Sequence, residues 1–133
     1  MFAHAPFYVQ RSELERARKE AGVTAAWFDF AGARFELLDG DAEIADGVRV
    51  VATPGHTIGH QSVVVDAGRG EAVMIGDAAY TAQIFEQGEN ADLRRWGGQY
   101  DDRSAWSRSL ERLHDMRPAT VHFCHDTRVV GHS

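Results

Sequence analysis

The sequence predicts an α/β fold in which helices cover one face of a mixed sheet. Three short apolar segments, at 48–52, 62–66 and 73–75, have the character of strands. An amphipathic helix at 104–116 follows them, and a last apolar strand lies at 121–124. Strands followed by a helix and one more strand, with few parallel crossovers, favour a layered α/β sandwich. A length of 133 residues fits one domain.

A strand and a helix are expected at the start of the chain. Residues 7–9 are apolar and aromatic, which is typical of a strand. Ser12 and Glu15 have the spacing of a capping box, with the serine at the N-cap of the helix. The helix should run to about residue 21, where Gly22 ends it.

The middle of the chain is predicted mainly as strands and loops. Residues 23–52 have strand character, with turns at 39–40 and 46–47. The segment 82–103 is polar and contains glycines, so we expect an irregular loop with one short helix. The helix at 104–116 has an apolar stripe at i, i+4 and i+7. This stripe consists of Trp106, Leu110 and Leu113.

The predicted helices are too few to cover both faces of the sheet. Each helix has one apolar face, so one side of the sheet should remain open. The side chains expected to contribute apolar surface beyond what the helices cover are Val48, Val50, Val63, Val65, Val73 and Ile75. Large exposed apolar patches usually find a partner. We therefore expect the chain to form a homo-oligomer through the exposed sheet face, to bind a hydrophobic dye or to aggregate.

Composition and charge exclude several classes of protein. Hydrophobic residues make up 44% and charged residues 26%, which is typical of a globular domain. The net charge of −6, with no basic run beyond Arg94-Arg95, argues against a nucleic-acid partner. A single cysteine, Cys124, excludes an intrachain disulfide and suits a reducing compartment. Residues 1–5 lack the pattern of a secretory signal, and no stretch reaches the roughly 18 apolar residues of a membrane span. The expectation is a cytoplasmic protein without a membrane partner.

Three polar residues stand where predicted apolar strands end. His56, Asp77 and His125 each follow such a strand directly or within a few residues. Loops at strand ends hold functional side chains on a rigid scaffold. Two imidazoles and a carboxylate are a ligand set suited to zinc, manganese or iron. The pattern indicates a metal site, although aspartate and histidine are also common at strand ends without such a role.

The local sequence around these residues is more specific. Residues 53–62, T-P-G-H-T-I-G-H-Q-S, resemble the T-P-G-H-T-x-G-H-x-S segment of the metallo-β-lactamase-fold superfamily. Residues 75–77 resemble its G-D segment, and residues 123–126 its last metal-ligand motif. The order and the spacing of the three segments also match. The resemblance extends from about residue 6 to residue 126.

A subgroup of this superfamily shares two further features with the chain. Tyr80 stands three residues after Asp77, as in the acyl-homoserine lactonases. Residues 5–10, followed by an acidic helix, resemble the stretch just after the first metal motif of that subgroup. The resemblance implies that the fold is the C-terminal half of a metallo-β-lactamase αββα sandwich. Residues 1–133 would then form a partial domain.

The resemblance also implies the chemistry. His56 would bind a first metal ion, His125 a second, and Asp77 would bridge them. Tyr80 would hydrogen-bond the lactone group of the substrate, so Asp77 and Tyr80 are the implied catalytic residues. The implied cofactor is two zinc ions, with manganese or iron as alternatives, and the implied reaction is hydrolysis of an ester such as an acyl-homoserine lactone. Thioester hydrolases of the glyoxalase II type share the three motifs, and Tyr80 favours the lactonase.

One family motif is missing from the sequence. No H-x-H-x-D-H segment occurs in it, and this motif supplies much of the metal site in the family. We therefore expect the chain to correspond to the C-terminal half of the family domain, through a misplaced start or a real truncation. We expect the isolated chain to be inactive. A non-catalytic remnant that serves as an interaction domain is the alternative outside the enzyme class.

Each candidate site residue also has a plainer interpretation. His56 could be a turn histidine, Asp77 a strand terminator, His125 a surface residue and Tyr80 a core residue with a satisfied hydroxyl. His60 forms an H-x-x-x-H pair with His56, a spacing that would suit two metal ligands on one face of a helix. Pro54, Gly55 and Gly59 argue against a helix in this segment. We therefore expect His60 to be a buried hydrogen-bonding residue that supports the site.

Overall fold

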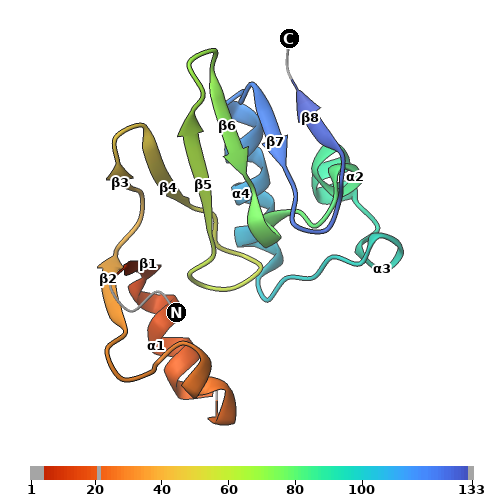
Figure 1. Cartoon of the computed structure of the whole chain (residues 1–133). Coiled ribbons are helices and arrows are strands. Elements are labelled where there is room, and N and C mark those ends of the chain that lie inside the picture. Colours follow the sequence, from red (N-terminus) through yellow and green to blue (C-terminus); the bar gives the residue numbers. More distant parts are fainter. Residues whose placement is uncertain (1–4, 21, 132–133) are drawn as a thin grey trace.

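The computed structural model describes residues 5–20 and 22–131 (Figure 1). Within these residues the main sheet has six strands in the order β3-β4-β5-β6-β7-β8. Neighbouring strands are antiparallel except β6 and β7, which are parallel. The strands are β3 (Ala42–Ala45), β4 (Val48–Ala52), β5 (Gln61–Asp66), β6 (Glu71–Met74), β7 (Thr120–His122) and β8 (Val129–Gly131). The predicted α/β fold with a mixed sheet is confirmed.

Helices connect the parallel strands β6 and β7, because parallel neighbours cannot be joined by a tight hairpin. The connection contains η2 (Gly76–Ala78), α2 (Ala82–Gln87), η3 (Gly88–Asn90), α3 (Leu93–Trp96) and α4 (Arg103–Asp115). Side chains cap the three α-helices of this connection. Thr81 accepts from the Ile84 N–H at the start of α2, and Asp102 accepts from the Ala105 N–H at the start of α4. The segment predicted as a loop with one short helix is therefore more regular than expected.

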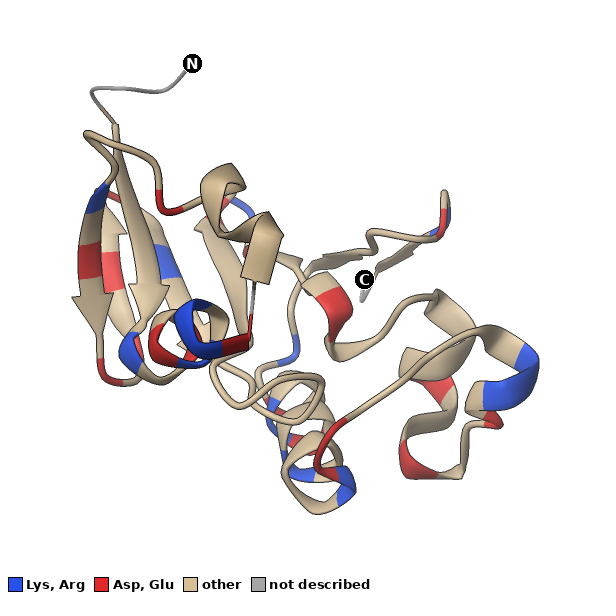
Figure 2. Cartoon of the chain, turned by 90° about the horizontal axis from the view of Figure 1, so that it is seen from below, with Lys and Arg blue, Asp and Glu red and all other residues tan. Residues whose placement is uncertain are grey.

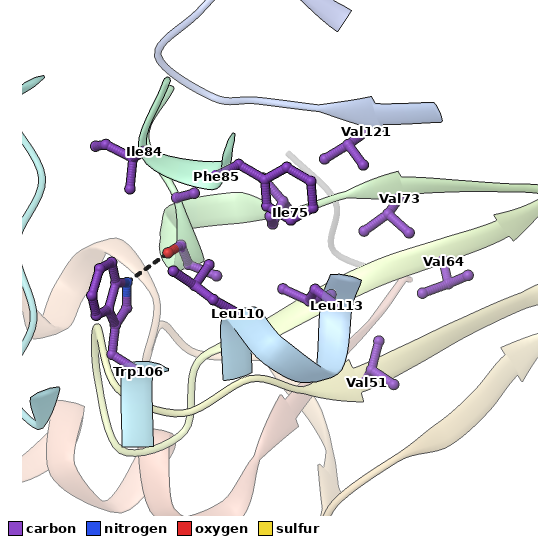
Figure 3. Packing of buried hydrophobic residues seen from close by; sticks show 12 residues of the cluster. Val51, Val64, Val73, Ile75, Ile84, Phe85, Trp106, Leu110, Leu113 and Val121 are labelled. Atoms are coloured by element: carbon purple, nitrogen blue, oxygen red, sulfur yellow. Dashed lines mark hydrogen bonds between the residues drawn. The ribbon is translucent and has the colours of Figure 1, made fainter. Parts of the chain in front are cut away.

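The main core lies between α4 and one face of the sheet (Figure 3). The predicted stripe of α4, Trp106, Leu110 and Leu113, is at most 2% exposed. The sheet side of this core consists of Val51, Val64, Val73 and Val121. The Trp106 indole N–H donates to the Ala78 carbonyl at 2.7 Å, which satisfies both buried polar groups. This hydrogen bond ties α4 to the loop that follows β6.

The opposite face of the sheet, here called the open face, carries apolar side chains that are less covered. Its members by strand register are Val48, Val50, Val63, Val65, Met74 and Val129. Val129 is 51% and Met74 38% exposed, whereas Val50 is buried. The expectation that Val50, Val73 and Ile75 add uncovered surface was wrong, because all three are buried. Val73 points toward α4, and Ile75 lies beyond the end of β6 within the same core.

A smaller two-stranded unit, counted within the described residues, lies at one end of the main sheet (Figure 1). β1 (Pro6–Gln10) pairs in parallel with β2 (Arg34–Leu38), and α1 (Arg11–Glu20) and η1 (Gly22–Trp27) connect them. The buried Gln10 side chain donates to the Gly40 carbonyl at 2.8 Å and to Gln61 Oε1 at 3.0 Å. Gln10 therefore joins this unit to the start of β5.

Charged residues of both signs are interleaved along α1 and the neighbouring strands (Figure 2). Ion pairs link α1 to surrounding segments, as in the contact between Arg11 and Asp39 at 2.9 Å and between Arg18 and Asp29 at 2.9 Å. Such exposed pairs contribute little to stability individually. No helix among the described residues is long and apolar enough to cross a membrane.

Several element boundaries differ from the prediction. α1 begins at Arg11, so Ser12 lies inside the helix rather than at its N-cap. Residues 22–27 form a 3-10 helix instead of a strand. β7 ends at His122, so the strand expected at 121–124 is shorter, and Cys124 is exposed in the following loop. β8 was not predicted, because three residues give too short a pattern to recognise.

Candidate metal centre

The strand directions bring three loops to one edge of the main sheet. β4 and β6 are both antiparallel to β5, so their C-terminal ends lie at the same edge. β7 runs parallel to β6, and its C-terminal end therefore lies there as well. The loops that follow these strands carry His56, Asp77 and His125, respectively. The topology thus places the three predicted ligands together, as the strand-end pattern suggested.

The two imidazoles approach opposite oxygens of the Asp77 carboxylate. His56 Nε2 lies 3.4 Å from Asp77 Oδ2, and His125 Nε2 lies 3.2 Å from Asp77 Oδ1. Two donors that each sit about 2.1 Å from one tetrahedral ion are about 3.4 Å apart. Each nitrogen–oxygen pair therefore has the spacing of two ligands on one ion. The donor set fits two divalent ions that share Asp77.

The three residues do not form one closed ligand set. Among the described residues, no three histidine, cysteine, aspartate or glutamate side chains converge on a single metal position. His56 and His125 lie next to different oxygens of the Asp77 carboxylate, so the two histidines do not meet at one position. A structural zinc site is usually four-coordinate. The described residues thus provide two donors for each of two positions.

The orientation of His56 is fixed by a backbone group. Its Nδ1 lies 3.2 Å from the Gln99 carbonyl oxygen, which can only accept, so Nδ1 carries the proton. In the neutral ring the lone pair then sits on Nε2, which faces Asp77. A partner on the distal ring nitrogen is the usual way in which a protein orients a metal-binding histidine. Sequence analysis could not identify Gln99, since its side chain takes no part.

His60 supports Asp77 instead of joining the ligands. Its Nε2 accepts the Asp77 backbone N–H at 2.9 Å, and its Nδ1 donates to the Thr53 carbonyl at 3.0 Å. This arrangement requires the neutral imidazole, and partial burial of the ring lowers its pKa. A side chain at Gly76 would collide with the ring, because a Cβ there would lie 2.8 Å from His60 Nε2. His60 thereby fixes the backbone that presents the Asp77 carboxylate.

Tyr80 lies beside both candidate histidines. Its ring stacks on His125 with a centroid distance of 4.4 Å and lies 5.8 Å from the His56 ring. Burial, followed by the negative charge of Asp77, raises the pKa of the Tyr80 hydroxyl. The phenol therefore stays protonated at neutral pH and can donate a hydrogen bond. Tyr80 is thus placed at the candidate site and also packs against the edge of the core.

Asp126 connects the loops of Tyr80 and His125, and sequence analysis assigned it no role. Its Oδ2 accepts the Ala82 N–H at 3.0 Å, at the start of α2, and the His125 N–H donates to the Tyr80 carbonyl at 3.3 Å. Backbone hydrogen bonds to Arg128 and Ala82 lower the pKa of the Asp126 carboxyl. The position of Asp126 directly after His125 was the available signal. It could not reveal a partner 44 residues away.

The chain matches the Metallo-beta-lactamase superfamily over residues 3–125, and it belongs to this superfamily. Relatives within it include N-acyl homoserine lactonases. The chain is 34% identical over 86 residues to one from a Bacillus species, and the match covers 64% of this chain and 34% of the relative. It is 33% identical over 87 residues to AiiA from Bacillus thuringiensis subsp. kurstaki, with the same coverage. The resemblance inferred from the motifs is confirmed.

Solved lactonase structures share the fold. One N-acyl homoserine lactone hydrolase, with N-hexanoyl-L-homoserine bound at its catalytic metal centre, superposes with a TM-score of 0.75 and 27% identity. A variant of B. thuringiensis AiiA with N-decanoyl-L-homoserine at its active site gives the same values. Both matches cover 95% of this chain and 49% of the other. The chain thus spans about half the length of these structures.

Proposed function

We propose that this chain carries part of the dinuclear metal site of a hydrolase that opens N-acyl homoserine lactones. The proposal rests on the placement of His56 and His125 at opposite oxygens of Asp77, with Tyr80 beside both rings. The lactonase relatives support this substrate class over the thioesters of glyoxalase II-type enzymes. Zinc is the proposed metal, since two imidazoles and a carboxylate suit it, and manganese or iron accept the same donors.

Each candidate residue has a distinct role in this proposal. His56 and His125 would each hold one ion, and Asp77 would be a ligand shared by both. Bound ions of this kind lower the pKa of water to about 7 and polarise an ester carbonyl. His60 holds the Asp77 backbone in place through its hydrogen bond at 2.9 Å. Asp77 and Tyr80 are the residues proposed to take part in the reaction.

Tyr80 is proposed to orient the lactone. Its raised pKa keeps the hydroxyl protonated, so it acts as a donor toward a substrate oxygen. The ring is held by stacking on His125, and the backbone carbonyl of Tyr80 accepts from the His125 N–H. The Tyr80 ring and the His125 imidazole therefore keep a fixed relative position. Tyr80→Phe should weaken turnover without removing metal, because no proposed ligand is lost.

Activity is proposed to require ligands beyond those in this sequence. The 133 residues contain no H-x-H-x-D-H segment, so the isolated chain should not turn over lactones. The direct test is a chimaera in which this chain replaces the matching half of AiiA from B. thuringiensis. Ring opening of a long-chain acyl-homoserine lactone is followed by proton release, with and without a chelator. A cooperative melt of the chimaera establishes that it has folded.

The outcomes separate the candidate functions. Chelator-sensitive lactone opening by the folded chimaera, largely lost in Asp77→Asn, supports the proposal. Turnover of thioesters but not of lactones favours the glyoxalase II type. A folded chimaera that holds metal but opens neither substrate supports a non-catalytic remnant. Chelator-sensitive turnover by residues 1–133 alone would show that the catalytic groups are assigned wrongly.

A further inference from the structure

Helix α1 contacts the loop that carries His56 near both ends of that loop, once directly and once through Asp101. The α1 residues involved lie outside the proposed metal site. We infer that Glu13 and Arg16, one turn apart on α1, are positioning residues that fix the orientation of the His56 imidazole. Neither side chain is a proposed ligand, and both act through the backbone of neighbouring loops. The inference rests on the proposed metal-holding role of His56.

Glu13 binds the far end of the loop at 53–60 directly. Its Oε2 accepts the Gly59 backbone N–H at 2.8 Å, although 46 residues separate the two. The backbones are also in close contact, because a Cβ on Gly59 would lie 2.4 Å from Glu13 Cβ and 2.7 Å from the Glu13 backbone nitrogen. Hydrogen bonds to a carboxylate are stronger than those between neutral groups. Glu13 therefore anchors the loop just before His60.

Arg16 acts on the near end of the loop through Asp101. The Arg16 guanidinium pairs with the Asp101 carboxylate. The Asp101 backbone N–H donates to the carbonyl oxygens of Gly55 at 2.8 Å and of His56 at 3.3 Å. The Asp102 N–H also donates to Gly55, at 3.0 Å. The backbone hydrogen bonds thus hold residues 101–102 against the backbone at Gly55 and His56, and the partly exposed ion pair links this segment to α1.

The segment at 99–102 also sets the tautomer of His56. Its Gln99 carbonyl accepts from His56 Nδ1 at 3.2 Å, two residues before Asp101. While this bond holds, the Nε2 lone pair faces Asp77. If the segment moved away, protonation of Nε2 would become competitive and the ring could rotate. Loss of a partner that orients a metal-binding histidine typically weakens metal affinity by about 10- to 100-fold.

A direct test reads the imidazole in the full chain without metal. Long-range proton–nitrogen correlation spectra of the ¹⁵N-histidine-labelled chain report which ring nitrogen of His56 carries the proton. At about pH 8 an ordinary imidazole is neutral, so the tautomers are distinguishable. Wild type should show His56 protonated at Nδ1. Glu13→Ala and Arg16→Ala should each shift His56 toward a mixture of tautomers. Glu13→Ala should also speed hydrogen exchange of the Gly59 amide by about tenfold or more, because that amide loses its acceptor.

Matched variants distinguish positioning from general loosening. Glu15→Ala changes an exposed carboxylate on the same helix, and Arg18→Ala breaks another ion pair of α1. Both should leave the His56 signals unchanged. Glu13→Gln retains an oxygen that can accept the Gly59 N–H and should restore the wild-type pattern. An unchanged His56 tautomer in both Glu13→Ala and Arg16→Ala, or an equal change in the two control variants, would overturn the inference.

Cobalt binding provides a second, separate measurement. If His56 binds metal as proposed, Glu13→Ala should weaken cobalt binding about tenfold or more relative to wild type, and Arg16→Ala, which breaks a partly exposed ion pair, by about two- to fivefold. Glu15→Ala should leave it unchanged. If the chain binds no cobalt even at millimolar concentrations of the ion, where a weak two-donor position should still fill, the metal role of His56 is refuted. The tautomer measurement then still decides the effect of α1. A tautomer shift with unchanged cobalt affinity would refute the positioning role for the metal.

Discussion

Replacing Gly55 by alanine tests how closely the His56 loop is seated on α4. A Cβ at this position would lie 2.3 Å from both the Cα and the backbone nitrogen of Trp106, far inside normal contact distance. Both atoms belong to the backbone of α4, so they cannot move away as the end of a flexible side chain could. The positive φ of Gly55, 137°, adds strain for any other residue. Overpacking and backbone strain each cost about 1–3 kcal/mol, and together we expect about 4 kcal/mol of lost stability.

The assay is urea unfolding followed by far-UV circular dichroism, with Gly68→Ala as the control. Gly68 also has a positive φ, 75°, but no atom lies within 4 Å of its added Cβ. Its substitution should therefore cost about 1 kcal/mol from backbone strain alone. The difference between the two variants isolates the collision with α4. If the two free energies of unfolding agreed within about 1 kcal/mol, the seating of the loop on α4 would be refuted.

Three further changes test the core, the metal site and the open face. Trp106→Phe should cost about 1–2 kcal/mol in urea unfolding, because the Ala78 carbonyl loses its donor. The isolated chain should hold zinc weakly after equilibration and gel filtration, since each position around Asp77 has two donors. Two tightly held ions per chain would contradict this. The chain should self-associate or bind a hydrophobic dye, and Met74→Lys should reduce both. A dye-free monomer by light scattering would count against an accessible apolar face.

The sequence was sufficient for elements with a long or well-marked pattern. The helix at 104–116 was found within one residue of α4, because Trp106, Leu110 and Leu113 repeat at the helical period. The turns around Gly40 and Gly47 were also found, since glycine marks positions of positive φ. Short elements could not be predicted from the sequence. Nothing in the sequence of β8 distinguishes three residues from a loop, and its position depends on pairing with β7.

The proximity of the three candidate residues could be predicted from sequence, but most of the groups that orient them could not. His56, Asp77 and His125 stand in specific motifs, and strand order then brings them together. The groups that orient them are backbone atoms or distant side chains. The Gln99 carbonyl sits 43 residues from His56, and Glu13 sits 46 residues from the glycine it binds. Such contacts arise from tertiary packing, which leaves no spacing that a single sequence displays.

The groups that orient the candidate ligands are present in this chain, although each proposed metal position has only two donors among the described residues. Asp77 is held by His60, the residue just before β5, and His56 is held by the Gln99 carbonyl. The backbone of His125 is held by the carbonyl of Tyr80. Each predicted ligand thus has an orienting partner within the described residues, although each proposed metal position has two donors here. A segment that completed the site would therefore need to add donors, and it would meet histidine and aspartate side chains whose backbone or ring is already fixed.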